Sequence, residues 1–377
     1  MASNKDKTPA EIQAEYERKL LATEKQVENK IIQLYSALIN QITPLAASQK
    51  LPPGIFSLDK LKILNNRLDT LLDTLNANIE TLVRAGINSS WKLSNEKNDL
   101  LADIRLEKTI ISAGKQATYY DTNVGALKAF ADQQINGLNL SDRIYKAGET
   151  FKAELEAGLG LGISEGQSAA EMARDLRQYL KEPDKLFRRV KDTEGNLQLS
   201  KNAAAYHPGQ GVYRSSTANI ERLTRTTING AYRTADNTRW QQMPFVLGQT
   251  IYTSGNHPKY DICDEMKGDY PVEFIFVGWH PQCLCFTVPK LMNNNQFKQY
   301  QQLVMTGKDS PENVGKIARP VISIPESANN WMNDNKDRVA GWKNPPSWWN
   351  QNSNYTPDLP TKKAGNRSPR LTEVKNL

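Results

Sequence analysis

The feature that most constrains the fold of this chain is the apolar repeat that runs through its first 110 residues or so. From about Pro9 to Gln41, apolar side chains recur at spacings of three, four or seven, which places them in one stripe along a helix. From Leu61 to Leu82, leucine and isoleucine alternate steps of three and four, like a heptad seam. These repeats predict two long helices that form an antiparallel hairpin or a small oligomeric coiled coil.

Prolines and glycines indicate where these helices should end. Pro44 and the run from Leu51 to Gly54 are expected to end the first helix, because proline cannot continue the helical hydrogen bonds. Ser57 offers an N-cap for the second helix, and Gly86 to Asn88 are expected to break or end it. We therefore assign residues 1–113 to an N-terminal region of long helices that contacts partners or other copies of the chain.

The middle of the chain is also predicted to be helical. Ser168 and Glu171 have the spacing of a capping box, so a helix should begin there. The glycine-rich stretch from Gly158 to Gly162 lacks the Lys-Ser/Thr ending of a phosphate loop and is expected to be a flexible joint. Another helix is expected to begin at Ser215 or Ser216.

A small strand-rich unit should follow this last helix. Residues 245–254 and 274–279 are rich in β-branched and aromatic side chains, and residues 285–288 alternate between apolar and polar. Beyond about Lys290, asparagine, proline and tryptophan are frequent, so residues 291–377 are expected to form an extended, largely irregular C-terminal tail. The predicted fold class is α+β, with residues 114–290 as the second domain.

The composition fits an elongated, modular protein that stays in the cytoplasm. The chain has 377 residues, enough for two or three domains, and hydrophobic residues make up only 38% of it. No apolar run approaches the roughly 18–20 residues that span a bilayer, and the polar start lacks the apolar core of a signal peptide. We expect no membrane span, and reduced thiols rather than disulfides.

Positive charge is concentrated in two places. Between Lys181 and Arg239 there are eleven Lys and Arg residues against six acids, and the C-terminus is basic as well. Both patches could bind the phosphates of double-stranded DNA or an acidic protein surface. The alternative is a solvated helix face and a disordered tail. The candidate nucleic-acid contacts are Arg222, Arg225, Arg233, Arg239, Lys362, Lys363, Arg367 and Arg370.

All three cysteines and two of the three histidines fall between His257 and Cys285. Thiolate and imidazole are the ligands that structural zinc prefers, so a Zn²⁺ site is one interpretation. A Cys–His nucleophile is a second, and plain packing of small-domain core residues is a third. The candidate metal ligands are His257, Cys263, His280, Cys283 and Cys285.

The order of these elements resembles the phage head morphogenesis domain of the Mu F-like minor head proteins. The resemblance covers roughly residues 125–290. It is carried by the helix with Arg225 and Thr226, the Asp261-Ile262-Cys263 turn, and the closing His280-Pro281-x-Cys283-x-Cys285. It implies a minor capsid protein of a tailed phage virion, assembled in the host cytoplasm, that takes part in head assembly and in DNA packaging or ejection. We assign no catalytic residues.

The resemblance also implies partners. A portal protein is the first, a scaffold or major capsid protein the second, and packaged DNA the third. Two departures from the family pattern bear on the metal. Met266 stands where many members have a further cysteine, and Leu284 stands where arginine is frequent. A zinc site would therefore have to recruit His257 or His280. The alternatives in function are a Cys/His-dependent hydrolase or toxin-type enzyme, and a zinc-stabilised DNA-binding protein.

Overall fold

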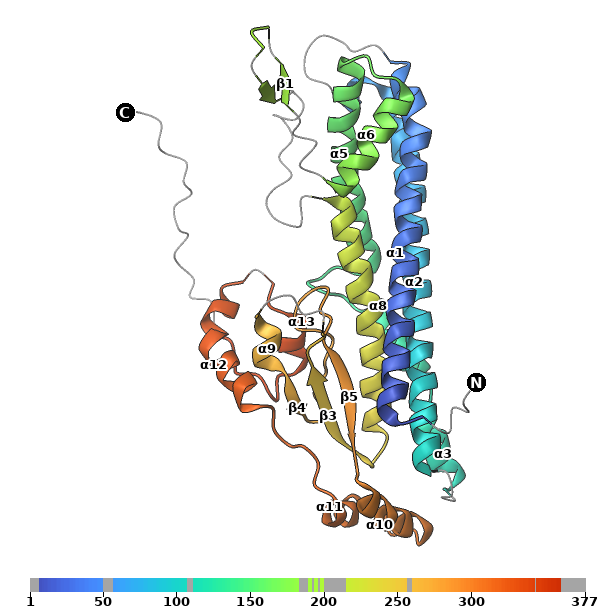
Figure 1. Cartoon of the computed structure of the whole chain (residues 1–377), viewed down its shortest axis with the longest axis vertical. Helices are drawn as coiled ribbons and strands as arrows, with labels where there is room; N and C mark the ends of the chain where they lie inside the picture. Colours follow the sequence, from blue (N-terminus) through green and yellow to red (C-terminus); the bar gives the residue numbers. More distant parts are fainter. Residues whose placement is uncertain are drawn as a thin grey trace, which may run out of the picture.

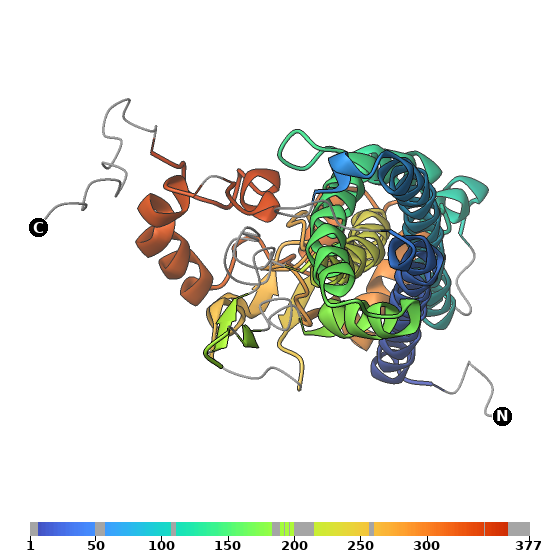
Figure 2. The same cartoon turned by 90° about the horizontal axis from the view of Figure 1, so that it is seen from above.

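The predicted α+β class is confirmed by a computed structural model in which a long helical bundle lies beside a small antiparallel sheet (Figure 1). The same two parts lie next to each other when seen from above (Figure 2). The structure describes residues 7–49, 57–106, 111–182, 189–191, 193–195, 197–199, 215–255, 260–342 and 344–360.

Five helices share the core of the bundle. Four of them begin at a residue whose side chain accepts from an N–H group of the first turn. Thr8 and Glu11 form a capping box at the first helix, and Ser168 and Glu171 form the predicted one at the fourth. The bundle helices are α1 (Pro9–Ala47), α2 (Lys62–Leu106), α5 (Leu140–Ser164), α6 (Ala169–Lys181) and α8 (Ser216–Gln241).

The first helix ends between its two predicted stops, and the predicted end of the second helix is wrong. Helix α1 continues through Pro44 to Ala47, where the buried Thr43 and Ala46 hold its last turn in the core. Helix α2 runs without interruption through Gly86, which is buried against Ile228 of α8. A β-carbon on Gly86 would lie 2.5 Å from Ile228 Cδ1, so the glycine allows α8 to approach rather than breaking the helix.

The predicted flexible joint from Gly158 to Gly162 lies inside helix α5, so that prediction is also wrong. A β-carbon on Gly158 would lie 2.4 Å from Leu176, and one on Gly162 would lie 2.4 Å from Met172. The glycines are therefore the surface on which α6 packs. Close packing between two helices compensates for their low helix propensity.

A three-stranded antiparallel sheet follows α8 along the chain. Its strands are β3 (Val246–Tyr252), β4 (Gly268–Tyr270) and β5 (Phe286–Leu291), in the order β4-β3-β5. The strand predicted over residues 274–279 is absent from the described structure of that segment. Phe274, Phe276 and Trp279 are instead core side chains of an irregular segment, since apolar content alone does not distinguish a strand from a buried loop.

The C-terminal region is not largely irregular as predicted, at least as far as Pro360. It contains four short helices, and the sheet and this region share one core. Trp348 donates from Nε1 to the carbonyl of Trp279 at 3.0 Å, and the two indole rings meet edge to face. These helices are α10 (Asn294–Met305), α11 (Pro311–Ile317), α12 (Glu326–Ala340) and α13 (Ser347–Gln351).

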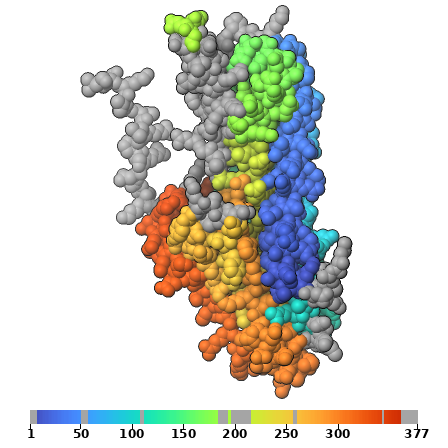
Figure 3. Space-filling model, in the orientation of Figure 1, coloured from blue at the N-terminus to red at the C-terminus, as the bar shows by residue number. Residues whose placement is uncertain are grey.

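A third core joins the helical bundle to the sheet unit, and its side chains come from distant parts of the sequence. Trp240, Phe245 and Tyr300 belong to this core, which also includes residues from the end of α2. In the space-filling view the sheet unit lies against the lower half of the bundle, and the C-terminal residues drawn in red lie on its outer side (Figure 3). The first core crosses the predicted domain boundary at residue 113, the second crosses the one at residue 290, and the third crosses both.

Six short elements complete the described structure. Ser57 caps the first of them, a 3-10 turn, rather than the long helix that follows. They are η2 (Leu58–Lys60), α3 (Ala113–Tyr119), α4 (Val124–Asp132), β1 (Arg189–Lys191), β2 (Leu197–Leu199) and α9 (Ile262–Met266). Among the helices of the described residues, none combines the length and apolar character that a bilayer crossing requires.

Candidate metal centre

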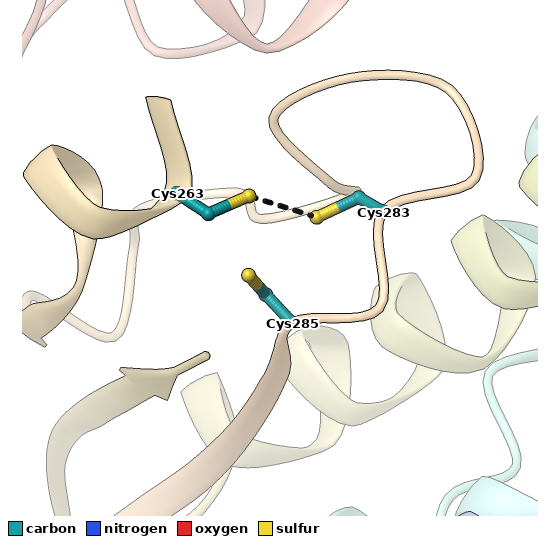
Figure 4. Close-up of side chains that lie close together, drawn as sticks. All are labelled: Cys263, Cys283 and Cys285. Carbon is teal, nitrogen blue, oxygen red and sulfur yellow. Dashed lines mark hydrogen bonds between the residues drawn. The ribbon is translucent and has the colours of Figure 1, made fainter. Parts of the chain in front are cut away.

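Three cysteines from two separate segments converge on one buried point (Figure 4). Cys263 comes from α9, whereas Cys283 and Cys285 come from the loop that leads into β5. Their sulfur atoms all lie within 4.8 Å of one another, and the Sγ atoms of Cys263 and Cys283 are 3.8 Å apart. Each residue is at most 4% exposed. This cluster could hold a metal ion.

Local turn chemistry brings the two segments together. The carboxylate of Asp261 accepts from the N–H of Cys263 at 2.7 Å and caps α9, which fixes the first thiol at a helix start. In the other segment, Cys283 N–H donates to the carbonyl of His280 at 3.1 Å. Gln282 has a φ of 61° in this turn, which reverses the chain between the histidine and the two cysteines.

His280 lies beside the thiols at the outer edge of the cluster. Its Nε2 is 3.2 Å from Cys263 Sγ, and its Nδ1 is 2.9 Å from the carbonyl of Pro281. A proton on Nδ1 that is donated to this carbonyl leaves the Nε2 lone pair directed at the cluster. The imidazole is 38% exposed, so the cluster has three buried sulfur donors and one donor at the solvent boundary.

The three thiols differ in pKa because they share hydrogen bonds. Donation from Cys263, then Cys285, and the charge of Arg233 lower the pKa of Cys283. The pKa of Cys263 is raised, because its proton is held by Cys283 and Cys285. Bonding to Cys263 lowers the pKa of Cys285, but bonding to Cys283 and burial outweigh this and raise it to about 12. Cys283 is therefore the first of the three to become a thiolate.

A polar stripe on α8 holds the backbone of this unit. The stripe consists of Thr226, Arg233 and Asn237, which share one face of the helix at spacings of seven and four. Thr226 Oγ1 accepts from Gln282 N–H at 3.1 Å. Asn237 Nδ2 donates to the carbonyls of residues 272 and 274.

Arg233 makes the closest connection between this stripe and the cysteines. Its Nη2 donates to the carbonyl of Cys283 at 3.0 Å and also to the carbonyl of Cys285. Its guanidinium lies 4.8 Å from the centre of the Phe276 ring. The sequence did not predict this role. The signal was available in the spacing of the stripe, but helical spacing alone does not identify what the stripe faces.

The predicted nucleic-acid contacts on α8 need correction for two residues. Arg233 is only 6% exposed, and Arg239 is fully buried with bonds to Asn95 and Asp99 at 2.9 and 2.7 Å. A phosphate backbone cannot reach either side chain. Arg225 pairs with Glu28 of α1 at 2.9 Å, and Arg222 is partly buried. The arginines of α8 therefore mainly make contacts within the protein.

Five of the predicted site residues lie outside the residues that the structure describes. One is the candidate ligand His257, and the others form the basic C-terminal patch. Of the five predicted metal ligands, the structure brings Cys263, Cys283 and Cys285 together and places His280 beside Cys263. The residues outside the described part are His257, Lys362, Lys363, Arg367 and Arg370.

The same geometry could serve a nucleophilic cysteine, since Cys263 and Asp261 both lie beside Nε2 of His280. Nε2 of His280 is 3.6 Å from Asp261 Oδ2 and 3.2 Å from Cys263 Sγ. Two observations weigh against this use. Cys263 is only 2% exposed, and its pKa is raised, whereas a nucleophilic thiol needs access to substrate and a lowered pKa.

Comparison with known proteins gives no match of any of three kinds: no family model, no curated protein and no solved structure matches this chain.

Proposed function

We propose that this chain is a minor head protein of a tailed bacteriophage, which binds the portal and takes part in head assembly. The observation that carries the proposal is the convergence of the motif residues. The residues that carry the resemblance to the head morphogenesis family form two adjoining groups that share Cys263, although up to 24 positions separate them. One group is Cys263, Cys283 and Cys285, and the other is Asp261, Cys263 and His280. A motif whose residues share one site is expected to bring them together in the fold, and this supports the proposal.

The architecture is consistent with this role. Helices of 39 and 45 residues make a long, rigid column beside the small unit. Such a column suits docking on a ring-shaped partner such as a portal, with a scaffold or major capsid protein as a further neighbour. Because Arg233 and Arg239 are buried, a contact with packaged DNA would depend on the basic C-terminal residues rather than on α8.

The direct test is physical association with phage heads. The chain should co-sediment with portal rings and proheads made from the phage genes that neighbour its own. Those neighbours should encode a portal and a scaffold or major capsid protein. Consistent absence of the chain from purified proheads and virions would contradict the proposal.

The metal that suits this site best is zinc, with Cys263, Cys283, Cys285 and His280 as its four ligands. Two sulfurs at ~2.3 Å from a tetrahedral zinc lie roughly 3.8 Å apart. The Cys263 and Cys283 sulfurs are separated by that distance. Zinc would supply a closed structural crosslink here, since three protein sulfurs and one imidazole leave no position for a substrate. The four ligand side chains would hold the zinc in place and would take part in no reaction.

We expect one zinc per chain in protein purified without chelator, measured by elemental analysis. Removal of zinc should lower the free energy of unfolding by about 4 kcal/mol relative to free zinc at a thousandfold excess over Kd. Cys285→Ser should lose the metal, whereas Leu284→Ala, which changes the exposed residue between two ligands, should keep it. Metal-free protein whose thiols stay fully reactive in the presence of zinc would exclude the site.

A further inference from the structure

Arg233 is the only residue that contacts both the carbonyl of Cys283 and that of Cys285 among the hydrogen bonds of the described residues. It belongs to α8, so it connects the cysteine loop to the bundle and not to the sheet. Its side chain is buried, and burial of a guanidinium is costly unless its donors are satisfied. Holding two carbonyls of the ligand loop is therefore the main use of this side chain.

The loop is built around the guanidinium. Gly278 has a φ of 108°, and a β-carbon at this position would lie 2.9 Å from Arg233 Nη1 and 3.1 Å from Cys283 Cβ. The centre of the Phe276 ring lies 4.8 Å from the guanidinium carbon. Residues from Phe276 to Cys285 thus contact one side chain of α8.

Charge gives Arg233 a second effect on the site. Three thiolates and a neutral imidazole around a divalent zinc carry a net charge of −1, and the guanidinium is a permanent positive charge next to it. Residues behind the ligands that orient and compensate a metal site change its affinity by about 10–100-fold when they are removed.

We propose that Arg233 is a positioning residue that couples metal binding to the docking of the small unit on the helical bundle. The metal fixes the two cysteines whose carbonyls Arg233 holds, and Arg233 prearranges the same cysteines for the metal. Because linkage is reciprocal, each event strengthens the other by the same factor. This inference rests on the metal site of the proposed function.

The test is a metal titration of the full chain with Co²⁺, followed by competition with Zn²⁺. Arg233→Gln should bind about 10–100-fold more weakly than wild type. Its cobalt spectrum should keep the sulfur charge-transfer band, because the ligands are unchanged. Arg225→Gln is the matched control: it removes an arginine of the same helix that pairs with Glu28 and touches no cysteine. It should bind like wild type.

Arg233→Lys separates position from charge. Lysine keeps the positive charge but lacks the planar fork that reaches two carbonyls at once, so the metal affinity of Arg233→Lys should lie between that of Arg233→Gln and that of wild type. Full recovery in Arg233→Lys would overturn the positioning role. Wild-type affinity in Arg233→Gln, or an equal loss in Arg225→Gln, would overturn the coupling.

Hydrogen exchange on the wild-type protein keeps the proposal testable if Arg233→Gln does not fold. Metal should slow exchange of the Gln282 N–H, which is bonded to Thr226 of α8, by at least tenfold. An unchanged rate with metal bound would overturn the coupling and leave the metal site intact. A wild-type chain that binds no metal would instead remove the zinc site itself.

Discussion

Buried charged side chains in the bundle differ in how closely they are paired with other groups. Lys97 and Asp236 are both fully buried and form an ion pair, and Ser94 and Asn98 donate to the same carboxylate at 2.6 and 2.8 Å. This network satisfies the charges where α2 meets α8. Glu24 of α1 is also buried, at 1% exposure, but Arg225 Nε approaches it only to 3.9 Å.

This difference predicts a pH dependence of stability. The pKa of Glu24 is raised to about 7, chiefly by burial and to a smaller degree by the charge of Glu28. The charges of Arg233 and Arg225 oppose this shift. The folded state therefore binds more protons than the unfolded state between about pH 4.5 and 7. The stabilisation that protonation of Glu24 gives the folded state is complete below this pH range and is lost as the pH rises through 7.

Glu24→Gln should remove this dependence, because the amide is neutral at all pH values. Between pH 5 and 8, the wild type should lose up to about 3 kcal/mol more unfolding free energy than the variant. Urea denaturation at the two pH values measures the difference. The exposed Glu149→Gln serves as control and should follow the wild type. Parallel profiles for all three proteins would show that Glu24 does not titrate in this range.

Among the elements, the contact between α5 and α6 is the one that depends most on glycine. Gly162→Val should place its side chain where Met172 now lies and force the two helices apart. Overpacking of this kind costs about 1–3 kcal/mol. Thermal unfolding measures the loss.

A helical glycine with open surroundings provides the control for this substitution. Gly315 of α11 has no atom within 4 Å of a built β-carbon, so Gly315→Ala should stabilise by about 0.5–1 kcal/mol. If Gly162→Val were as stable as the wild type, the flexible joint that the sequence suggested would be the better description of this stretch.

The whole molecule depends on its C-terminal region more than the predicted boundary at residue 290 suggests. A chain that ends at Lys290 loses Trp348 and Trp349 and leaves Trp279 without its partner. We expect this truncated chain to bind a hydrophobic dye and to lose the cooperative unfolding of the sheet unit. A chain that ends at Pro360 keeps the described core and should unfold like the full chain. Equal behaviour of the two truncated chains would separate the C-terminal helices from that core.

Local signals in the sequence determined much of this protein. The apolar repeats specified α1 and α2, the capping box specified α6, and Ser215 specified the start of α8, because each depends on residues within one or two helical turns. The concentration of cysteine and histidine also identified the candidate site before its geometry was known.

Only the tertiary structure decided the parts that depend on distant residues. Gly86 and Gly162 are helical because another helix packs on them, and the apolar segment 274–279 is a buried loop because Trp348 and Asn352 cover it. Arg233 has the charge that a DNA contact requires, but it lies inside the protein, where its donors hold the cysteine loop. A sequence shows what a side chain can bind, whereas packing over long separations decides what it can reach.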